Sequence, residues 1–196
     1  HPVMVLRKEF AADSGGPGEH RGGAAVVYDR MVVSGADVYP LLLHLRVLPW
    51  GSDGAQPGRP GAAWVGRPDD PPPGTEVARV WLAGNGDTPP LHPLGGYFDD
   101  ALSPTDRESG TWVNGLSDID ATAGTLVRVR TPGAGGWGDP LRRDPAAVLR
   151  DVRDGYVTVD GARRDYGVVV TGDPVTAPQA LAVDEAATRE EREGTR

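Results

Sequence analysis

Two glycine-rich segments hold most of the polar residues whose types and spacing could support chemistry. The first, DSGGPGEHRGG over 13–23, combines an acid, a hydroxyl, an imidazole and a guanidinium. The second, PGAGGWGDP over 132–140, places an aromatic residue and an acid among glycines. Glycine permits positive φ and close backbone approach. These segments therefore form tight turns, or they present Asp13, Arg21 and Asp139 to a cleft or a partner subunit.

Residue spacings that would indicate nucleotide, nucleophile or metal chemistry are not found. The first glycine-rich segment lacks G-x-x-x-x-G-K-[ST], and the second opens no helix directly after its glycines. Ser14 has no G-x-S-x-G surroundings, and no two of the four histidines lie at a metal-binding spacing. Two acidic pairs remain as cation candidates: Asp99 with Asp100, and Asp118 with Asp120. Without EF-hand spacing, solvated surface charge is the commoner explanation, so we assign no metal ligand.

Composition excludes several classes of protein. The 196 residues include 28 glycines, 19 prolines and no cysteine, which argues against a helix bundle, a disulfide scaffold, a zinc–thiolate site and thiol catalysis. The formal net charge of −8 is opposite to that of a phosphate-neutralising nucleic-acid binder. No apolar run approaches the roughly 20 residues that span a bilayer, and no secretory signal is recognisable. We therefore expect a cytoplasmic protein that binds neither nucleic acid nor membrane and that, beginning at His1, is part of something longer.

Alternating and β-branched segments predict a mainly β fold. Joined by Gly/Pro-rich turns, these segments cover residues 2–10, 24–33, 38–48, 75–83, 125–131 and 168–170. Asp144 caps and Pro145 opens a predicted helix over 144–155. Thr158 caps a second, shorter helix that ends at Gly167. The predicted fold class is mainly β (α+β with minor helix), with two short helices near the C-terminus.

The acidic residues suggest how the chain is organised. Residues 84–124 show no sustained period and hold seven acids against one base, so we interpret them as a structureless acidic insertion. One domain then covers residues 1–171. Residues 172–196 form a tail, which is an exposed helix or disordered, because 184–193 begins with two acids and is mostly charged.

Three segments, in this order along the chain, carry a family resemblance. DSGGPGEHRGG at 13–23 is similar to the pattern D-S-G-G-x-G-x-x-R-G-G, and LPWGSDGAQPGRPG at 48–61 resembles P-P-W-G-x-x-G-G-x-x-G. Residues 131–170 resemble a C-terminal signature almost without a gap. Together they resemble the C-terminal part of the hydantoinase B/oxoprolinase family. Members of that family are much longer, so the resemblance implies that the hydantoinase B N-terminal portion is missing here.

The resemblance implies a part of an ATP-dependent, hetero-oligomeric hydrolase that opens cyclic amides such as hydantoins or 5-oxoproline. A hydantoinase A-like partner would handle the nucleotide. ATP and a divalent metal are expected for the complete enzyme, with no cofactor bound by this chain. Two alternatives stay open: a subunit of an acetone/acetophenone carboxylase-type enzyme, and a non-catalytic structural or interaction module.

No residue of this chain is assigned a catalytic role. Candidates for a substrate cleft or its loops come from the three resembling segments: Asp13, Ser14, Gly15, Gly16, His20, Arg21, Gly22, Gly23, Trp50, Gly51, Gly133, Gly135, Gly136, Trp137, Gly138 and Asp139. We expect Arg21 to be at least half buried and hydrogen-bonded to backbone or to Asp13, because its planar fork of donors suits a glycine-lined turn. Since nucleophile, metal and nucleotide sites all lack candidates, we expect the isolated chain to be inactive.

Overall fold

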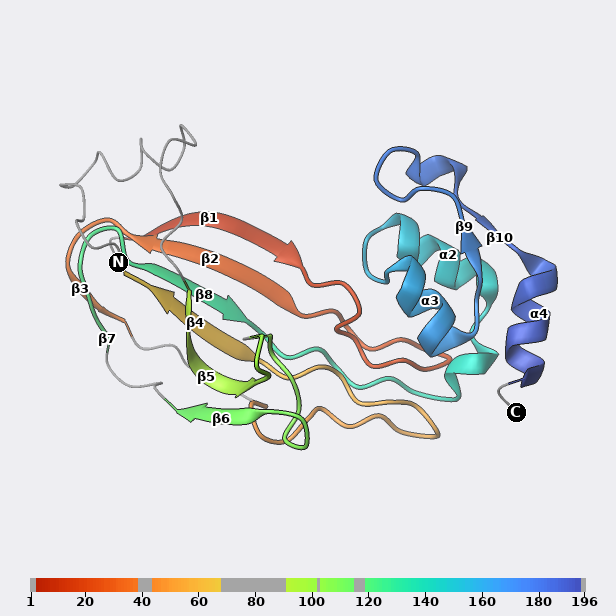
Figure 1. The fold of residues 1–196 in the computed structure, drawn as a ribbon, viewed down its shortest axis with the longest axis horizontal. Helices are drawn as coiled ribbons and strands as arrows, with labels where there is room; N and C mark the ends of the chain where they lie inside the picture. The colour runs from red at the N-terminus through yellow and green to blue at the C-terminus, as the bar shows by residue number, and fades with distance from the viewer. Residues whose placement is uncertain (1–2, 39–43, 68–90, 102, 115–118, 195–196) are drawn as a thin grey trace. The chain divides into compact units, whose positions relative to one another are not determined.

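Figure 1 shows a computed structural model that describes residues 3–38, 44–67, 91–101, 103–114 and 119–194. The chain divides into two compact units, each built from three stretches of sequence. The sheet unit comprises His1–Glu9, Val26–Val47 and Pro60–Thr131. The loop–helix unit comprises Phe10–Ala25, Leu48–Arg59 and Pro132–Arg196. Each unit therefore combines segments that are distant in sequence.

The sheet unit is built around a six-stranded sheet with the strand order β1–β2–β8–β4–β5–β6. Its strands are β1 (Val3–Phe10), β2 (Val26–Val32), β4 (Ala62–Gly66), β5 (His92–Phe98), β6 (Thr111–Asn114) and β8 (Leu126–Arg130). The ladders β2–β8, β8–β4, β4–β5 and β5–β6 are antiparallel. A separate antiparallel pair joins β3 (Ala36–Val38) to β7 (Ile119–Ala121). These strands confirm the mainly β fold predicted from the sequence.

The centre of the sheet is buried and carries a paired charge. All five residues of β4, AAWVG, are buried, as expected for a strand that is covered on both faces. Asp29 of β2 lies opposite Arg128 of β8 in the ladder. Its carboxylate accepts hydrogen bonds from Nε and Nη2 of Arg128 at 2.7 and 2.8 Å. This bidentate pairing compensates for the burial of a charged carboxylate in the sheet.

The loop–helix unit contains the helices. They are α2 (Pro145–Arg153), α3 (Val159–Tyr166) and α4 (Glu185–Gly194), with a short strand pair formed by β9 (Val170–Thr171) and β10 (Ala182–Val183). The predicted N-caps are confirmed, because Asp144 accepts from Ala146 N and Thr158 accepts from Gly161 N. Gly167 ends α3 with a left-handed φ of 59°. Within the described residues, no helix has the length and apolar character needed to cross a bilayer.

An apolar cluster from α2, α3 and the β9–β10 region forms the core of the loop–helix unit. Its buried members are Val148, Val152, Val157, Ala162, Tyr166, Val168, Val170 and Leu181. Part of the predicted tail joins this unit, since Leu181 belongs to the cluster and Thr188 of α4 is buried. Thr188 Oγ1 also accepts a hydrogen bond from Val169 N at 3.0 Å. The domain boundaries 1–171 and 172–196 nevertheless stay a prediction.

Burial gives this core a pH dependence. It raises the pKa of the Tyr166 phenol above its ordinary value of 10.0, because ionisation would place a charge in an apolar environment. The folded state therefore keeps the phenol neutral, whereas the unfolded state ionises it once the pH exceeds the pKa of an unfolded tyrosine. Above that pH, ionisation favours the unfolded state and lowers the stability of the fold. We expect the free energy of unfolding to fall by about 1.4 kcal/mol per pH unit above pH ~10.

Urea unfolding measured on both sides of pH ~10 tests this expectation. Tyr166→Phe removes the titrating group while keeping the ring, so the variant should lose this component of the pH dependence. Identical pH profiles for the two proteins would contradict the assignment to Tyr166.

Two expectations about local structure were wrong. Residues 84–124 are not structureless, because their described part contains β5, β6 and β7. β5 has the sequence HPLGGYF, and its proline and glycines have a low propensity for strands. It forms a strand because it pairs with β4 and β6. In the strand predicted over 38–48, β3 ends at Val38, and residues 44–48 form no strand. The predicted strand 75–83 lies outside the described residues, and the interpretation of 84–124 as an insertion stays a prediction.

Candidate functional site

Three glycine-rich segments that are far apart in sequence meet in the loop–helix unit. They are residues 13–23, 49–58 and 132–139, and we call them the glycine platform. Backbone hydrogen bonds join every pair of segments: Gly16 N donates to Ala134 O at 2.8 Å, Ser52 N to Gly136 O at 3.0 Å, and Gln56 N to Pro17 O at 2.8 Å. The fold thus combines the three family-like segments into one hydrogen-bonded assembly.

Many glycines of the platform are required because neighbouring carbonyl groups occupy the space of a side chain. A Cβ added at Gly133 would overlap the carbonyl oxygen of Ser14. One added at Gly22 would overlap the carbonyl oxygen of Ala134. Gly23 is different, since the nearest atom to an added Cβ there is Ala134 Cβ at 3.8 Å. Gly133 and Gly22 are therefore needed mainly because the absence of a side chain lets the backbone segments approach closely.

Arg21 locks the first segment from inside. Only 14% of its side chain is exposed, and its Nη1 donates to Gly22 O at 2.7 Å. Its Nε and Nη2 donate to the two carboxylate oxygens of Asp151 at 3.2 and 3.3 Å, and its guanidinium lies over the Tyr156 ring. The predicted burial and backbone hydrogen bond are confirmed. The carboxylate that pairs with Arg21 is Asp151 rather than Asp13.

Asp151 of α2 joins two arginines. Besides Arg21 it accepts a hydrogen bond from Arg143 Nη2 at 2.9 Å. The Asp151 and Arg143 side chains are 12% and 14% exposed, and Arg143 Nη1 also donates to Glu19 O at 2.8 Å. We call Arg21, Asp151 and Arg143 the arginine–aspartate cluster. It connects α2 to the first segment of the platform. Because the three side chains are largely buried, removing one partner leaves an uncompensated buried charge.

Asp13 and Ser14 have structural partners. Asp13 accepts from Thr158 N at 2.9 Å and from Thr158 Oγ1 at 2.6 Å, at the start of α3. Ser14 is fully buried. Its hydroxyl donates to Ala11 O at 2.6 Å and accepts from Ala25 N at 2.7 Å. Both side chains therefore hold the turn in place, and the Ser14 hydroxyl has backbone partners where a nucleophile would need a base.

The exposed edge of the platform carries aromatic side chains. Trp50 is 75% and Trp137 is 49% exposed, and the His20 ring lies 5.3 Å from the Trp137 ring between centroids. Asp139 is also exposed, with one carboxylate oxygen accepting from Leu141 N at 2.9 Å. Exposed tryptophans on a rigid backbone are typical of an interaction surface.

All of the predicted site residues lie in the loop–helix unit, where they have three different roles. The glycines shape the backbone, and Asp13, Ser14 and Arg21 hold it. The remaining residues are exposed: His20, Trp50, Trp137 and Asp139. Within the described residues, no group of three or more His, Asp or Glu side chains could hold a metal ion. The geometry supports binding and positioning, and the described residues of the glycine platform offer no nucleophile–base pair, since the Ser14 hydroxyl bonds to backbone.

Sequence reasoning missed Asp151 and Arg143. Asp151 lies in α2 between Val148 and Val152, the residues of the apolar stripe. A charged residue within an apolar stripe is a signal that it has a buried partner, because aspartate is rarely buried unpaired. The identity of that partner could not be inferred, since Arg21 lies 130 positions away along the chain.

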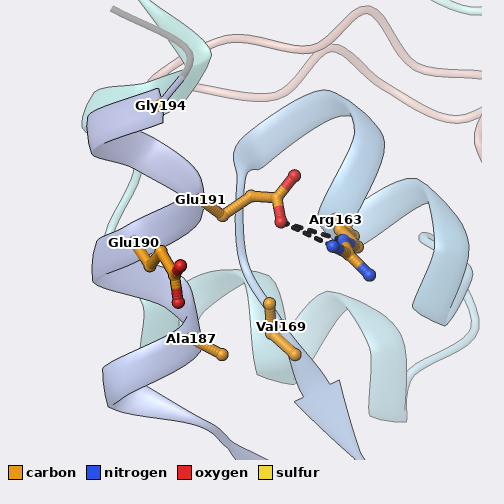
Figure 2. Close-up of a pocket in the computed structure, with 6 residues that line it drawn as sticks. All are labelled: Arg163, Val169, Ala187, Glu190, Glu191 and Gly194. Atoms are coloured by element: carbon orange, nitrogen blue, oxygen red, sulfur yellow. Dashed lines mark hydrogen bonds and ion pairs between the residues drawn. The ribbon is translucent and has the colours of Figure 1, made fainter.

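A separate hollow of about 450 Å³ lies where α4 meets α3 and Val169. Figure 2 shows Glu191 of α4 turned toward Arg163 of α3 beside this hollow, and the two side chains form an ion pair of 2.8 Å between Nη2 and Oε2. Its lining also includes Ala187, Glu190 and Gly194. None of the predicted site residues lines it, so the hollow and the glycine platform are distinct features of the same unit.

Comparison with known proteins supports the family resemblance that the three glycine-rich segments indicate. The sequence profile described as hydantoinase B/oxoprolinase matches residues 1–140. Caprolactamase subunit beta of Pseudomonas jessenii is 32% identical over 98% of this chain. The solved nucleotide-free structure of acetone carboxylase, from work on ATP-dependent acetone carboxylation, superimposes with a TM-score of 0.71 and 27% identity over the whole chain. The crystal structure of ATP-dependent caprolactamase from Pseudomonas jessenii gives 0.65 and 30% over 98% of the chain.

The chain is much shorter than these relatives. It spans 26% of the caprolactamase subunit and 25% of the acetone carboxylase chain, about a quarter in each case. About three quarters of each relative therefore has no counterpart in this chain, and the activity of the whole relative depends on those parts as well.

Proposed function

The chain belongs to the hydantoinase B/oxoprolinase family, and we propose that it is the C-terminal domain or split subunit of an ATP-dependent cyclic amidohydrolase. In this role it works with the hydantoinase B N-terminal portion and a hydantoinase A-like subunit in the cytoplasm. Its substrate class is a lactam, hydantoin or 5-oxoproline, whose ring amide is hydrolysed.

The observation that carries this proposal is the likeness to an ATP-dependent caprolactamase along almost the whole chain. The identity is 32% over 192 residues, and the match includes the three segments that build the glycine platform. The platform contributes shape and rigidity, because its glycines allow the backbone segments to pack closely and its charges are paired internally. The reacting groups then come from the rest of the assembly.

The carboxylase alternative has its own support. The acetone carboxylase structure has the higher TM-score, 0.71 against 0.65 for caprolactamase. In that case the complete enzyme adds carbon dioxide equivalents to an activated ketone and does not open a ring amide. The assembly would be similar, and the two proposals differ in the substrate of the complete enzyme and in the reaction that it carries out.

We propose that ATP and a divalent metal act in the complete enzyme and are held by its other parts. The described residues of this chain do not fit a metal site, because they contain no cluster of three His, Asp or Glu ligands. The glycine platform does not fit a phosphate-binding loop either, since many of its amides and carbonyls bond to one another. No catalytic step is therefore assigned to this chain.

The test is reconstitution. The 196-residue chain is co-expressed with the neighbouring hydantoinase A-like and N-terminal hydantoinase B polypeptides, and the purified complex is incubated with ATP and caprolactam, 5-oxoproline or hydantoin. ATP-dependent release of the ring-opened product is expected, which is an amino acid from caprolactam or 5-oxoproline and an N-carbamoyl amino acid from hydantoin. Consumption of acetone and bicarbonate, with no ring opening, would favour the carboxylase alternative.

The isolated chain is expected to be catalytically silent. Its one buried serine hydroxyl in the platform bonds to backbone, and its buried acid Asp151 is neutralised by arginines. We therefore expect no ATP hydrolysis and no ring opening by the purified chain, with or without added Mg²⁺ or Zn²⁺. Turnover that is abolished by Asp13→Ala would contradict this expectation and would locate a site in the first segment.

A further inference from the structure

We propose that Trp50 and Trp137, with the carboxylates of Asp53 and Asp139, form a docking surface for a lysine- or arginine-bearing segment of the partner assembly. The identity of the assembly rests on the proposed function. The choice of surface and the chemistry of its occupant rest on the glycine platform itself.

The four side chains belong to neighbouring parts of one rigid backbone. Trp137 forms a β-bridge with Ser52, two residues after Trp50, and Gly138 N donates to Ser52 O at 3.0 Å. The turn that holds Asp53 lies beside Asp139, since a Cβ added at Gly54 would be 3.8 Å from Asp139 N. The residues that carry the two indole rings and the two carboxylates are thus neighbours on backbone that is already ordered, which lowers the entropy cost of binding.

The indole faces at this edge have no cation of their own. Three other aromatic rings among the described residues do: Lys8 lies 5.2 Å from the Tyr28 ring, Arg46 4.4 Å from the Trp112 ring, and Arg21 4.8 Å from the Tyr156 ring. In the described part of the structure, no arginine or lysine lies over Trp50 or Trp137. Tryptophan is the aromatic side chain that attracts a cation most strongly.

Charge at this edge also favours a cationic occupant. Asp139 has one carboxylate oxygen engaged by Leu141 N, and no described residue pairs with the Asp53 carboxylate. The nearby base Arg142 is already paired with Glu19 at 3.6 Å. Carboxylates with no basic partner among the described residues, beside exposed indole rings, attract a guanidinium or ammonium group through both Coulomb and cation–π interactions.

The experiment measures the dissociation constant between the 196-residue chain and the co-purified hydantoinase A-like and N-terminal hydantoinase B polypeptides. For Trp50→Ala with Trp137→Ala we expect binding weaker by about 100-fold or more, because buried tryptophans dominate interface energies. Trp50→Phe with Trp137→Phe, which keeps aromatic faces, should lose less. Val175→Ala removes another exposed apolar group of the same unit, one that is 86% exposed, and should bind as the wild type does.

A second arm tests the charge of the occupant. Asp53→Asn with Asp139→Asn should weaken binding by about 10-fold and flatten its dependence on salt concentration. Asparagine tolerates the left-handed φ of 55° at position 53 and can accept the same cap hydrogen bond at position 139, so the fold is retained.

The outcomes separate the inference from the proposed function. Wild-type affinity in the double tryptophan variant would overturn the docking surface and leave the proposed function standing. Weakened binding in that variant with an unchanged salt dependence in the double asparagine variant would overturn the basic occupant. Failure of the wild-type chain to bind the assembly at all would overturn both the proposed function and this inference.

Discussion

Replacement of Gly22 by alanine is expected to unfold the glycine platform, with a loss of at least about 3 kcal/mol in the free energy of unfolding. The added Cβ would overlap the carbonyl group of Ala134. That group is backbone and cannot move without breaking the hydrogen bond that it accepts from Gly16 N at 2.8 Å. Urea unfolding followed by tryptophan fluorescence measures the loss, because Trp50 and Trp137 belong to the same unit.

The matched control is the next residue. Gly23→Ala adds the same methyl group, but there the nearest atom is Ala134 Cβ at an ordinary 3.8 Å. Neither glycine has a positive φ among the described residues, so alanine is strained at neither position by conformation alone. We expect Gly23→Ala to change stability by less than about 1 kcal/mol. Equal effects at the two positions would contradict the packing that the structure shows.

Asp151→Asn is expected to destabilise the loop–helix unit by about 3 kcal/mol or more. The substitution keeps the shape of the side chain and removes its charge, which leaves Arg21 and Arg143 largely buried without a carboxylate. The expected consequence is local release of the first platform segment from α2. Urea unfolding gives the size of the loss, and hydrogen exchange at residues 13–23 reports whether the release is local.

The control for Asp151 is an exposed ion pair of the same unit. Glu191→Gln removes the partner of Arg163, whose side chain is 64% exposed, and should cost far less stability than Asp151→Asn, because solvent screens an exposed ion pair. A variant that replaces the whole arginine–aspartate cluster with apolar residues of similar volume should recover stability, because no buried charge is then left unpaired. A loss in that variant as large as in Asp151→Asn would show that the charges themselves are needed.

Several features of the fold could be predicted because they depend on residues close together in the chain. The caps of α2 and α3 at Asp144 and Thr158 need only a side-chain oxygen and the next few amides. The alternation in β1, β2 and β8 indicates strands for the same reason. β5 could not be found in this way, since its proline and glycines are weak strand formers and its pairing partners determine its conformation.

The sequence by itself determined the family, the glycine-rich segments and the burial of Arg21, because residue types and spacings carry that information. It could not distinguish Gly22 from Gly23, although the two are adjacent and identical. Only the tertiary structure decided that one faces the carbonyl of Ala134 and the other does not. The same holds for the choice of Asp151 over Asp13 as the partner of Arg21, made across 130 positions. Contacts between distant segments depend on how the whole chain packs, and no local pattern records that packing.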